Sequence, residues 1–195
     1  MYELKDQEMI FVFTGPNGAG RRTVAEMSGT TLGIKQVLSY TTRPPRPGEV
    51  DGEDYHFISG EAFIEADRRQ EFMEVIEIDG FMYGIKDSDL AEMIQAGNAI
   101  YVVLNRYGAE MLKQLYGKNV VRISIYADRE TILARQRDRG DSALMIERYM
   151  SHYDEEMAYR SECEHAFENI DSAHTMFDLT KILDGYLNRN LLDLD

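Results

Sequence analysis

The chain has 195 residues, 44% of them hydrophobic and 29% charged, which suits one folded domain with a substantial core. The formal net charge of −14 argues against a nucleic-acid-binding surface, which would need a large basic face, but arginines gathered in one cleft can still bind small phosphate compounds. A single cysteine, Cys163, excludes an internal disulfide and a multi-cysteine metal site. The polar N-terminus and the short apolar runs predict a cytoplasmic protein without membrane contact.

The first predicted element is a hydrophobic strand over Met9–Phe13, which leads into a glycine-rich turn. Gly15 and Gly20 have the spacing of the phosphate-binding pattern G-x-x-x-x-G-K-[ST], and a helix is expected from Arg21. Glycine amides and the positive end of the helix dipole can together hold a phosphate group. The alternative is an ordinary glycine-rich turn between a strand and a helix. The candidate phosphate-binding residues are Gly15, Pro16, Asn17, Gly18, Ala19, Gly20, Arg21, Arg22 and Thr23.

Two side chains of this loop depart from the usual pattern. Arg21 replaces the lysine and keeps its positive charge, but as a wide planar fork. Arg22 replaces the metal-binding hydroxyl residue and cannot ligate a metal ion. Beside the phosphates, Arg22 would instead neutralise charge that a metal normally covers, which predicts weak magnesium dependence. Thr23 supplies a hydroxyl only if the loop shifts by one residue.

Strands and helices alternate through most of the remaining chain. Strands are predicted at Gln36–Ser39, Ala99–Leu104, Val120–Tyr126 and Ala166–Asn169. Helices are predicted at Asp87–Ala96, Tyr107–Tyr116, Asp128–Arg139, Leu144–Arg160 and Ser172–Tyr186, with Asp128 and Ser172 as N-caps. This alternation predicts an α/β fold, with a parallel sheet flanked by helices and phosphate bound at the carboxyl ends of its strands.

One segment, residues 41–85, interrupts this alternation with turn formers and short strand-like pieces. It contains the strand-like runs Asp54–Ile58 and Phe72–Ile78 and a short helical pattern at Gly60–Arg69. We expect a small subdomain inserted into a core made of residues 1–40 and 86–195.

The segment Ser39–Phe57, SYTTRPPRPGEVDGEDYHF, resembles the GMP-binding segment of the guanylate kinase family, S-x-T-T-R-x-P-R-x-G-E-x-x-G-x-D-Y-x-F. The resemblance continues through Phe72-Met73-Glu74, Tyr83-Gly84 and the arginine-bearing segment near 135–148, and it spans about residues 10–187. It implies a P-loop core, a GMP-binding subdomain at about 41–85 and a helical lid at about 135–150. It also implies transfer of a phosphoryl group from ATP to GMP, with Mg²⁺ accompanying ATP.

The resemblance also assigns roles to individual residues. Arginine forks match the phosphate dianion of a nucleoside monophosphate, and a carboxylate at Glu74 would accept hydrogen bonds from the guanine edge. The implied GMP-binding residues are Ser39, Arg43, Arg46, Tyr55, Glu74, Tyr83 and Asn105. The implied catalytic residues are Arg21, Arg43, Arg135, Arg139 and Arg148, and Asn169 matches a position near the adenine site.

Three positions depart from the family pattern. Val103 and Asn105 stand where the family carries an aspartate pair that serves the magnesium and guanine sites, and Ile85 replaces a serine or threonine that contacts guanine. No protein ligand for a metal is therefore expected. The sequence leaves open a working kinase, a catalytically degenerate GMP-binding or protein-interaction module, and a kinase for another acceptor.

Overall fold

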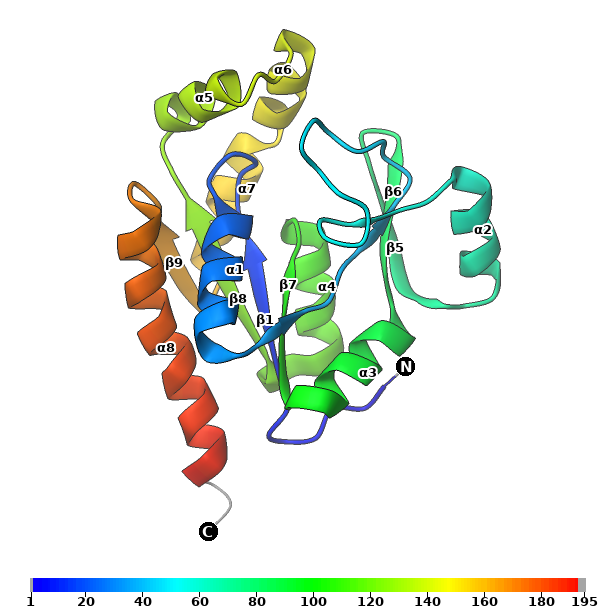
Figure 1. Cartoon of the computed structure of the whole chain (residues 1–195), viewed down its shortest axis with the longest axis vertical. Helices are drawn as coiled ribbons and strands as arrows, with labels where there is room; N and C mark the ends of the chain where they lie inside the picture. The colour runs from blue at the N-terminus through cyan, green and yellow to red at the C-terminus, as the bar shows by residue number, and fades with distance from the viewer. Residues whose placement is uncertain (1, 193–195) are drawn as a thin grey trace.

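The main part of the fold is a parallel sheet between two helical layers (Figure 1). The computed structural model describes the backbone of residues 2–192, and the side chains of 2–73 and 75–187. All strand pairings in the core sheet are parallel, in the order β2-β7-β1-β8-β9. Its strands are β1 (Met9–Thr14), β2 (Lys35–Gln36), β7 (Ala99–Val103), β8 (Val120–Tyr126) and β9 (His165–Glu168).

The central strand β1 is buried along its whole length, because helices cover both faces of the sheet. Phe11 and Phe13 pack with α1 (Arg21–Leu32) and α8 (Ser172–Leu192), whereas Ile10 and Val12 pack with α3 (Asp87–Gly97) and α4 (Arg106–Tyr116). Alternation across the pleat thus sends successive side chains into two separate hydrophobic clusters. A 3₁₀ turn, η1 (Gly117–Asn119), joins α4 to β8.

A second sheet stands beside the core and is built from short strands. Its order is β4-β3-β6-β5, from β3 (Tyr40–Thr41), β4 (His56–Phe57), β5 (Phe72–Ile78) and β6 (Phe81–Lys86). Helix α2 (Gly60–Arg68) packs on it through Phe63, whose ring stacks on Phe72 at 4.3 Å between centroids. The side chain of Ser59 caps this helix by accepting from the amide of Ala62.

Three short helices follow β8: α5 (Arg129–Asp138), α6 (Ala143–Ser151) and α7 (Tyr153–Tyr159), of which α5 and α6 lie above the glycine-rich turn in Figure 1. A 3₁₀ turn, η2 (Arg160–Glu162), leads from α7 toward β9. Asp128 caps α5 by accepting from the amide of Thr131, as predicted.

Three sequence predictions need correction. The segment Gln36–Ser39 is not one strand: β2 ends at Gln36 in the core sheet and β3 begins at Tyr40 in the small sheet, because the chain crosses between the sheets here. The predicted helix Leu144–Arg160 is two helices separated at His152, although its helical spacing is uninterrupted. Asp171, not Ser172, caps α8, since its carboxylate accepts from the amide of His174.

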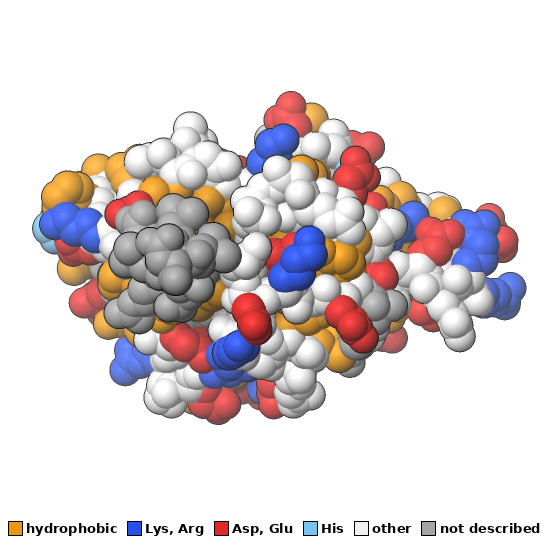
Figure 2. Space-filling view, turned by 90° about the horizontal axis from the view of Figure 1, so that it is seen from below, with side chains coloured by type: hydrophobic (Ala, Val, Ile, Leu, Met, Phe, Trp, Pro, Cys, Tyr) orange, Lys and Arg blue, Asp and Glu red, His pale blue; other side chains and the backbone are white. Residues whose placement is uncertain are grey.

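Acidic and basic side chains are interspersed on the face seen in Figure 2. Across residues 2–192, the model contains no helix that is long and apolar enough to cross a membrane.

Candidate functional site

The glycine-rich turn is held too tightly for larger residues. A Cβ atom on Gly15 would lie 2.1 Å from the carbonyl oxygen of Ile125, and one on Gly20 would lie 2.4 Å from the amide nitrogen of Asn169. Both glycines also have positive φ angles, 121° and 89°, which L side chains rarely adopt. Steric crowding and positive φ angles therefore explain why glycine stands at both ends of the motif.

Side chains from α5 and from the end of β9 brace this loop. Asn169, 1% exposed, donates from Nδ2 to the carbonyl of Ala19 at 2.7 Å. Arg135 donates to the carbonyl of Asn169 at 2.7 Å, and Gln136 donates to the carbonyl of Asn17 at 2.9 Å. The structure thus places Asn169 behind the loop as a support, and Gln136 is a supporting residue that the sequence did not indicate.

The N-terminus of α1, which follows the loop, lies at an open cleft. Gly20 caps the helix in a left-handed conformation, without a side-chain cap and without an acidic residue in the first turn. Such an uncapped N-terminus suits an anion, because its amides and its dipole both favour negative charge.

Arg21, the first residue of α1, extends across the cleft to the end of β7. Its Nη1 donates to the carbonyl of Leu104 at 2.8 Å. Burial lowers the pKa of the Arg21 guanidinium, and the negative charge of Glu156 opposes that shift. Arg21 therefore lies beside the two positions, Val103 and Asn105, where the sequence departs from the aspartate pair.

Arg22 points in a different direction from the one expected for a phosphate ligand. Its guanidinium forms an ion pair with Asp54, donates to the Asp54 carbonyl at 3.1 Å, and lies over the Tyr55 ring at 5.1 Å. Arg22 thus connects α1 to the loop before β4. Thr23 is exposed.

Two arginines share one carboxylate beside the cleft, and of the two only Arg46 is a lining residue. Glu49 forms ion pairs with Arg43 at 2.9 Å and with Arg46 at 3.5 Å. Arg43 is 8% exposed and lies over the Tyr55 ring at 5.4 Å. Burial acts to lower the pKa of the Arg43 guanidinium, but the neighbouring carboxylate of Glu49 raises it above its ordinary value. Among the described residues, the buried Nε groups of both arginines have no hydrogen-bond partner, which is unusual unless a ligand supplies the acceptor.

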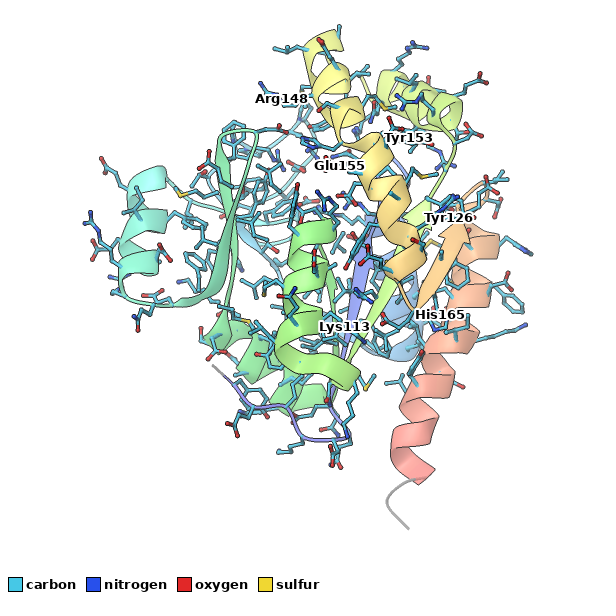
Figure 3. All side chains as sticks on the ribbon, turned by 180° about the vertical axis from the view of Figure 1, so that it is seen from behind. Lys113, Tyr126, Arg148, Tyr153, Glu155 and His165 are labelled. Atoms are coloured by element: carbon cyan, nitrogen blue, oxygen red, sulfur yellow. The ribbon has the colours of Figure 1, made fainter. Side chains whose placement is uncertain are left out.

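Many of the predicted residues line one cleft between the two sheets, and some do not. Those lining it are Gly15, Asn17, Arg21, Ser39, Arg46, Tyr55, Tyr83 and Asn105. Arg135, Arg139 and Asn169 instead meet the loop from behind or above, with Arg139 also paired to Asp141. Arg148 is exposed on α6 (Figure 3) and is not a lining residue. The side chain of Glu74 lies outside the described part of the chain.

Sequence reasoning missed three lining residues from α6, α7 and the junction between them: Tyr149, His152 and Glu156. Tyr149 lies under the Arg46 guanidinium at 4.6 Å, and His152 contacts Asp79 of the β5–β6 turn at 3.2 Å. These contacts join the helices above the loop to the small sheet. No local signal distinguishes them, since each occurs in an ordinary helical pattern.

Glu156 is a buried carboxylate in the same cleft, 8% exposed. Its Oε1 accepts from the amide of Arg106 at 3.2 Å, while Oε2 is buried without a partner among the described residues. Burial raises its pKa, and the charge of Arg21 is the largest opposing influence.

Part of the lining of the cleft is apolar. Ile76, Ile85, Val103 and Met111 line it, and Ile85 is 2% exposed. Asn105 also lines it, but its Oδ1 accepts from the amide of Gly108 at 3.0 Å and caps α4. Two of the departures noted in the sequence thus replace polar contacts with hydrocarbon.

The fold and this cleft define a nucleotide-binding α/β protein of the kinase class. The sequence model described as guanylate kinase matches residues 7–186. A guanylate kinase from Dechloromonas aromatica is 31% identical over 176 residues, covering 89% of this chain and 87% of that protein. One from Pseudomonas fluorescens Pf-5 is 30% identical over 175 residues, covering 89% and 85%.

A solved guanylate kinase structure from Anaplasma phagocytophilum shares the fold, with a TM-score of 0.73 and 24% identity, covering 91% of this chain and 85% of that one. The chain belongs to the guanylate kinase family.

The reaction of this family generally uses Mg²⁺, but the residues present here do not suit a protein-bound magnesium ion. Magnesium prefers carboxylate, carbonyl and hydroxyl oxygens. The side chain of Val103 has no oxygen, the side-chain oxygen of Asn105 caps a helix, and Arg22 occupies the hydroxyl position of the loop. The described residues contain no group of three or more His, Cys, Asp or Glu able to hold a metal.

Proposed function

We propose that this chain transfers the γ-phosphoryl group of ATP to GMP. The observation that carries the proposal is the pair Arg43 and Arg46, which share the carboxylate of Glu49 and whose buried Nε groups have no acceptor among the described residues. Arg46 lines the same cleft as Gly15 and Asn17 of the glycine-rich loop, and Arg43 lies directly behind Arg46 on Glu49. The phosphate of GMP would accept these donors, together with the hydroxyls of Tyr55 and Tyr83. The loop amides would hold the phosphates of ATP.

The chain's own residues supply positioning and charge for the transfer. Phosphoryl transfer spreads negative charge over the equatorial oxygens of the moving group, so preorganised guanidinium groups stabilise it. Arg21 projects into the cleft from the loop side, and Arg135 and Arg139 contact the loop from α5. We assign these three to the donor phosphates.

The proposal divides the chain into three working parts: a core of 1–40 and 86–195, a GMP-binding part at 41–85, and a lid at about 135–150. The contacts of Tyr149 with Arg46 and of His152 with Asp79 would exclude water from the cleft by holding the lid against the small sheet. Arg148, exposed on α6, reaches the phosphates only if the lid moves further.

A second candidate is a GMP-binding module without turnover. The loss of the aspartate pair at Val103 and Asn105 favours it, because loss of one well-placed electrostatic group costs about 10²–10³ in rate. Ile85 and the other apolar lining residues favour weak selection of guanine, which supports a third candidate, a kinase for a different acceptor.

A coupled assay for ADP with ATP and GMP, combined with calorimetry of GMP binding, tests these alternatives. A kinase produces ADP only when GMP is present, and Arg43→Lys abolishes most of that rate. GMP binding without ADP production supports the module. The same calorimetry with dGMP, AMP, UMP and CMP identifies the preferred base, and absence of heat with all five overturns the proposal.

A further inference from the structure

The end of β7 is occupied by a guanidinium group. Arg21 donates to the carbonyl of Leu104 at 2.8 Å, between Val103 and Asn105. In the resemblance described above, these two positions carry carboxylates that serve the magnesium and guanine sites. In this chain both carboxylates are gone and a fixed positive charge lies at the same strand end.

A carboxylate lies in the same cleft as Arg21. Burial lowers the pKa of the Arg21 guanidinium, and the charge of Glu156, which also lines the cleft, is the largest influence that opposes this shift. The Leu104 carbonyl fixes one edge of the fork, which leaves further N–H groups for phosphate oxygens. The side-chain oxygen of Asn105 accepts a hydrogen bond at the N-terminus of α4, and its amide group carries no negative charge.

We infer that the guanidinium of Arg21 is the cation of the donor-phosphate site, so that the chain binds a nucleoside triphosphate in its metal-free form. This inference rests on the proposed function, since it requires the triphosphate to bind at the glycine-rich loop. A metal-free triphosphate carries two more negative charges than its magnesium complex. A site lined by Arg21 and approached by Arg135 and Arg139, in which neither Val103 nor Asn105 offers a carboxylate, attracts that extra charge.

The inference has a thermodynamic consequence that needs no turnover. If a divalent ion does not strengthen binding of the triphosphate to the protein, then the protein does not strengthen binding of the ion to the triphosphate, because linkage is reciprocal. The two halves of that statement are measured independently.

The first experiment is calorimetry of the full-length protein with ATP, in EDTA and in saturating Mg²⁺, after a GMP titration in each buffer. We expect the Kd for ATP in EDTA to equal or fall below the Kd in Mg²⁺. A Kd more than tenfold higher in EDTA, with GMP still bound, overturns the inference and leaves the proposed function standing. Failure of both nucleotides to bind in either buffer overturns the proposed function and the inference with it.

The second experiment uses Mn²⁺ as a paramagnetic probe. Adding the protein to an equimolar Mn²⁺–ATP mixture is expected to leave the free Mn²⁺ signal unchanged or to raise it. A fall in that signal shows that the protein contributes to metal binding and overturns the inference.

The third experiment removes the charge with Arg21→Gln. We expect ATP affinity in EDTA to fall at least tenfold, and Mg²⁺ to restore part of the loss, which creates a metal dependence that the wild type lacks. Arg137→Gln, on the exposed side of α5, is the matched control and keeps the wild-type ratio. A thermal melt checks that both variants fold. An Arg21→Gln variant that folds and keeps wild-type affinity for ATP in EDTA overturns the inference. If the variant does not fold, the first two experiments still test the inference on the wild-type protein.

Discussion

The guanidinium of Arg22 lies 5.1 Å from the centroid of the Tyr55 ring and forms an ion pair with Asp54. A residue of the glycine-rich loop therefore connects the core helix α1 to the small sheet. The carboxylate of Asp54 neutralises Arg22, so we assign the donor-phosphate charge to Arg21 instead.

We predict that Arg22→Ser and Asp54→Asn each lower stability by about 0.5–1 kcal/mol, because the pair is partly exposed. The melting temperature should fall by about 1–4 °C in each case. The double variant should lose little more than either single one, which a double-mutant cycle measures. Arg68→Ser, exposed on α2, is the control, and strictly additive losses would contradict the coupling.

The tight loop predicts a difference between two glycines with positive φ. Gly33→Ala should cost about 1–2 kcal/mol from backbone strain alone, since a Cβ there meets nothing within 4 Å. Gly20→Ala adds a contact of 2.4 Å with the Asn169 amide nitrogen, so it should also displace the loop. We expect Gly20→Ala to lose ATP binding in calorimetry and Gly33→Ala to keep it. Equal ATP affinity in both variants would show that the close approach is unimportant.

The fork of Arg43 predicts that lysine cannot replace it. Arg43 donates to the Pro44 carbonyl at 2.8 Å and to Glu49 at 2.9 Å, and its Nε group remains for a phosphate oxygen. An ammonium group has no such geometry. Arg43→Lys should weaken GMP at least tenfold, about 1.4 kcal/mol or more, while binding of guanosine, which lacks phosphate, stays constant. Arg68→Lys is the control. An equal loss for guanosine would place the effect outside the phosphate site.

The ion pairs of Glu164 predict a stability change at acid pH. Although burial opposes it, hydrogen bonds from Arg122 and Lys113 lower the pKa of Glu164 to about 2. Its folded pKa lies below the unfolded value, so its contribution is present above about pH 4.5 and is lost as the pH falls toward about 2. Glu164→Gln should cost about 1–2 kcal/mol at pH 7 after allowing for partial exposure, and nothing near pH 2. Denaturant titrations across this range measure it, and a cost independent of pH would contradict the assignment.

The environment of Cys163 predicts an unreactive thiol. Burial raises its pKa to about 12, so almost no thiolate is present at pH 8. A disulfide exchange reagent should modify the native protein at least tenfold more slowly than the unfolded chain. Equal rates would show that the side chain is accessible and ionised.

Much of the fold could be predicted because its strands carry a local signal. The run Val120–Tyr126 is apolar on nearly successive residues and forms β8 with the same bounds. The break at His152 was not predictable, since the helical spacing continues through it and the packing of Tyr149 and Tyr153 sets the two directions.

The site was predictable only where a motif is contiguous. Gly15 and Gly20 belong to a motif whose spacing indicates phosphate binding, and Arg43 and Arg46 belong to a segment that resembles the GMP-binding segment of the family. Glu156 lies in the run Asp154-Glu155-Glu156, where nothing local separates it from its exposed neighbour Glu155 (Figure 3). Glu156 lines the cleft only because of the way α7 packs, and the spacing of residues along the sequence does not reveal this packing.

The chain crosses between the two sheets only after Gln36 and again after Lys86, and the strands at these crossings, β3 and β6, are paired through Tyr40 and Gly84. Entry and exit are therefore separated by little more than the spacing of adjacent strands, about 5 Å. We therefore expect that this segment can be deleted and its ends joined by a short turn, or that it can be replaced by the corresponding segment of another kinase. Exchange of this segment would then change the preferred acceptor while the core sheet and its helices keep their structure.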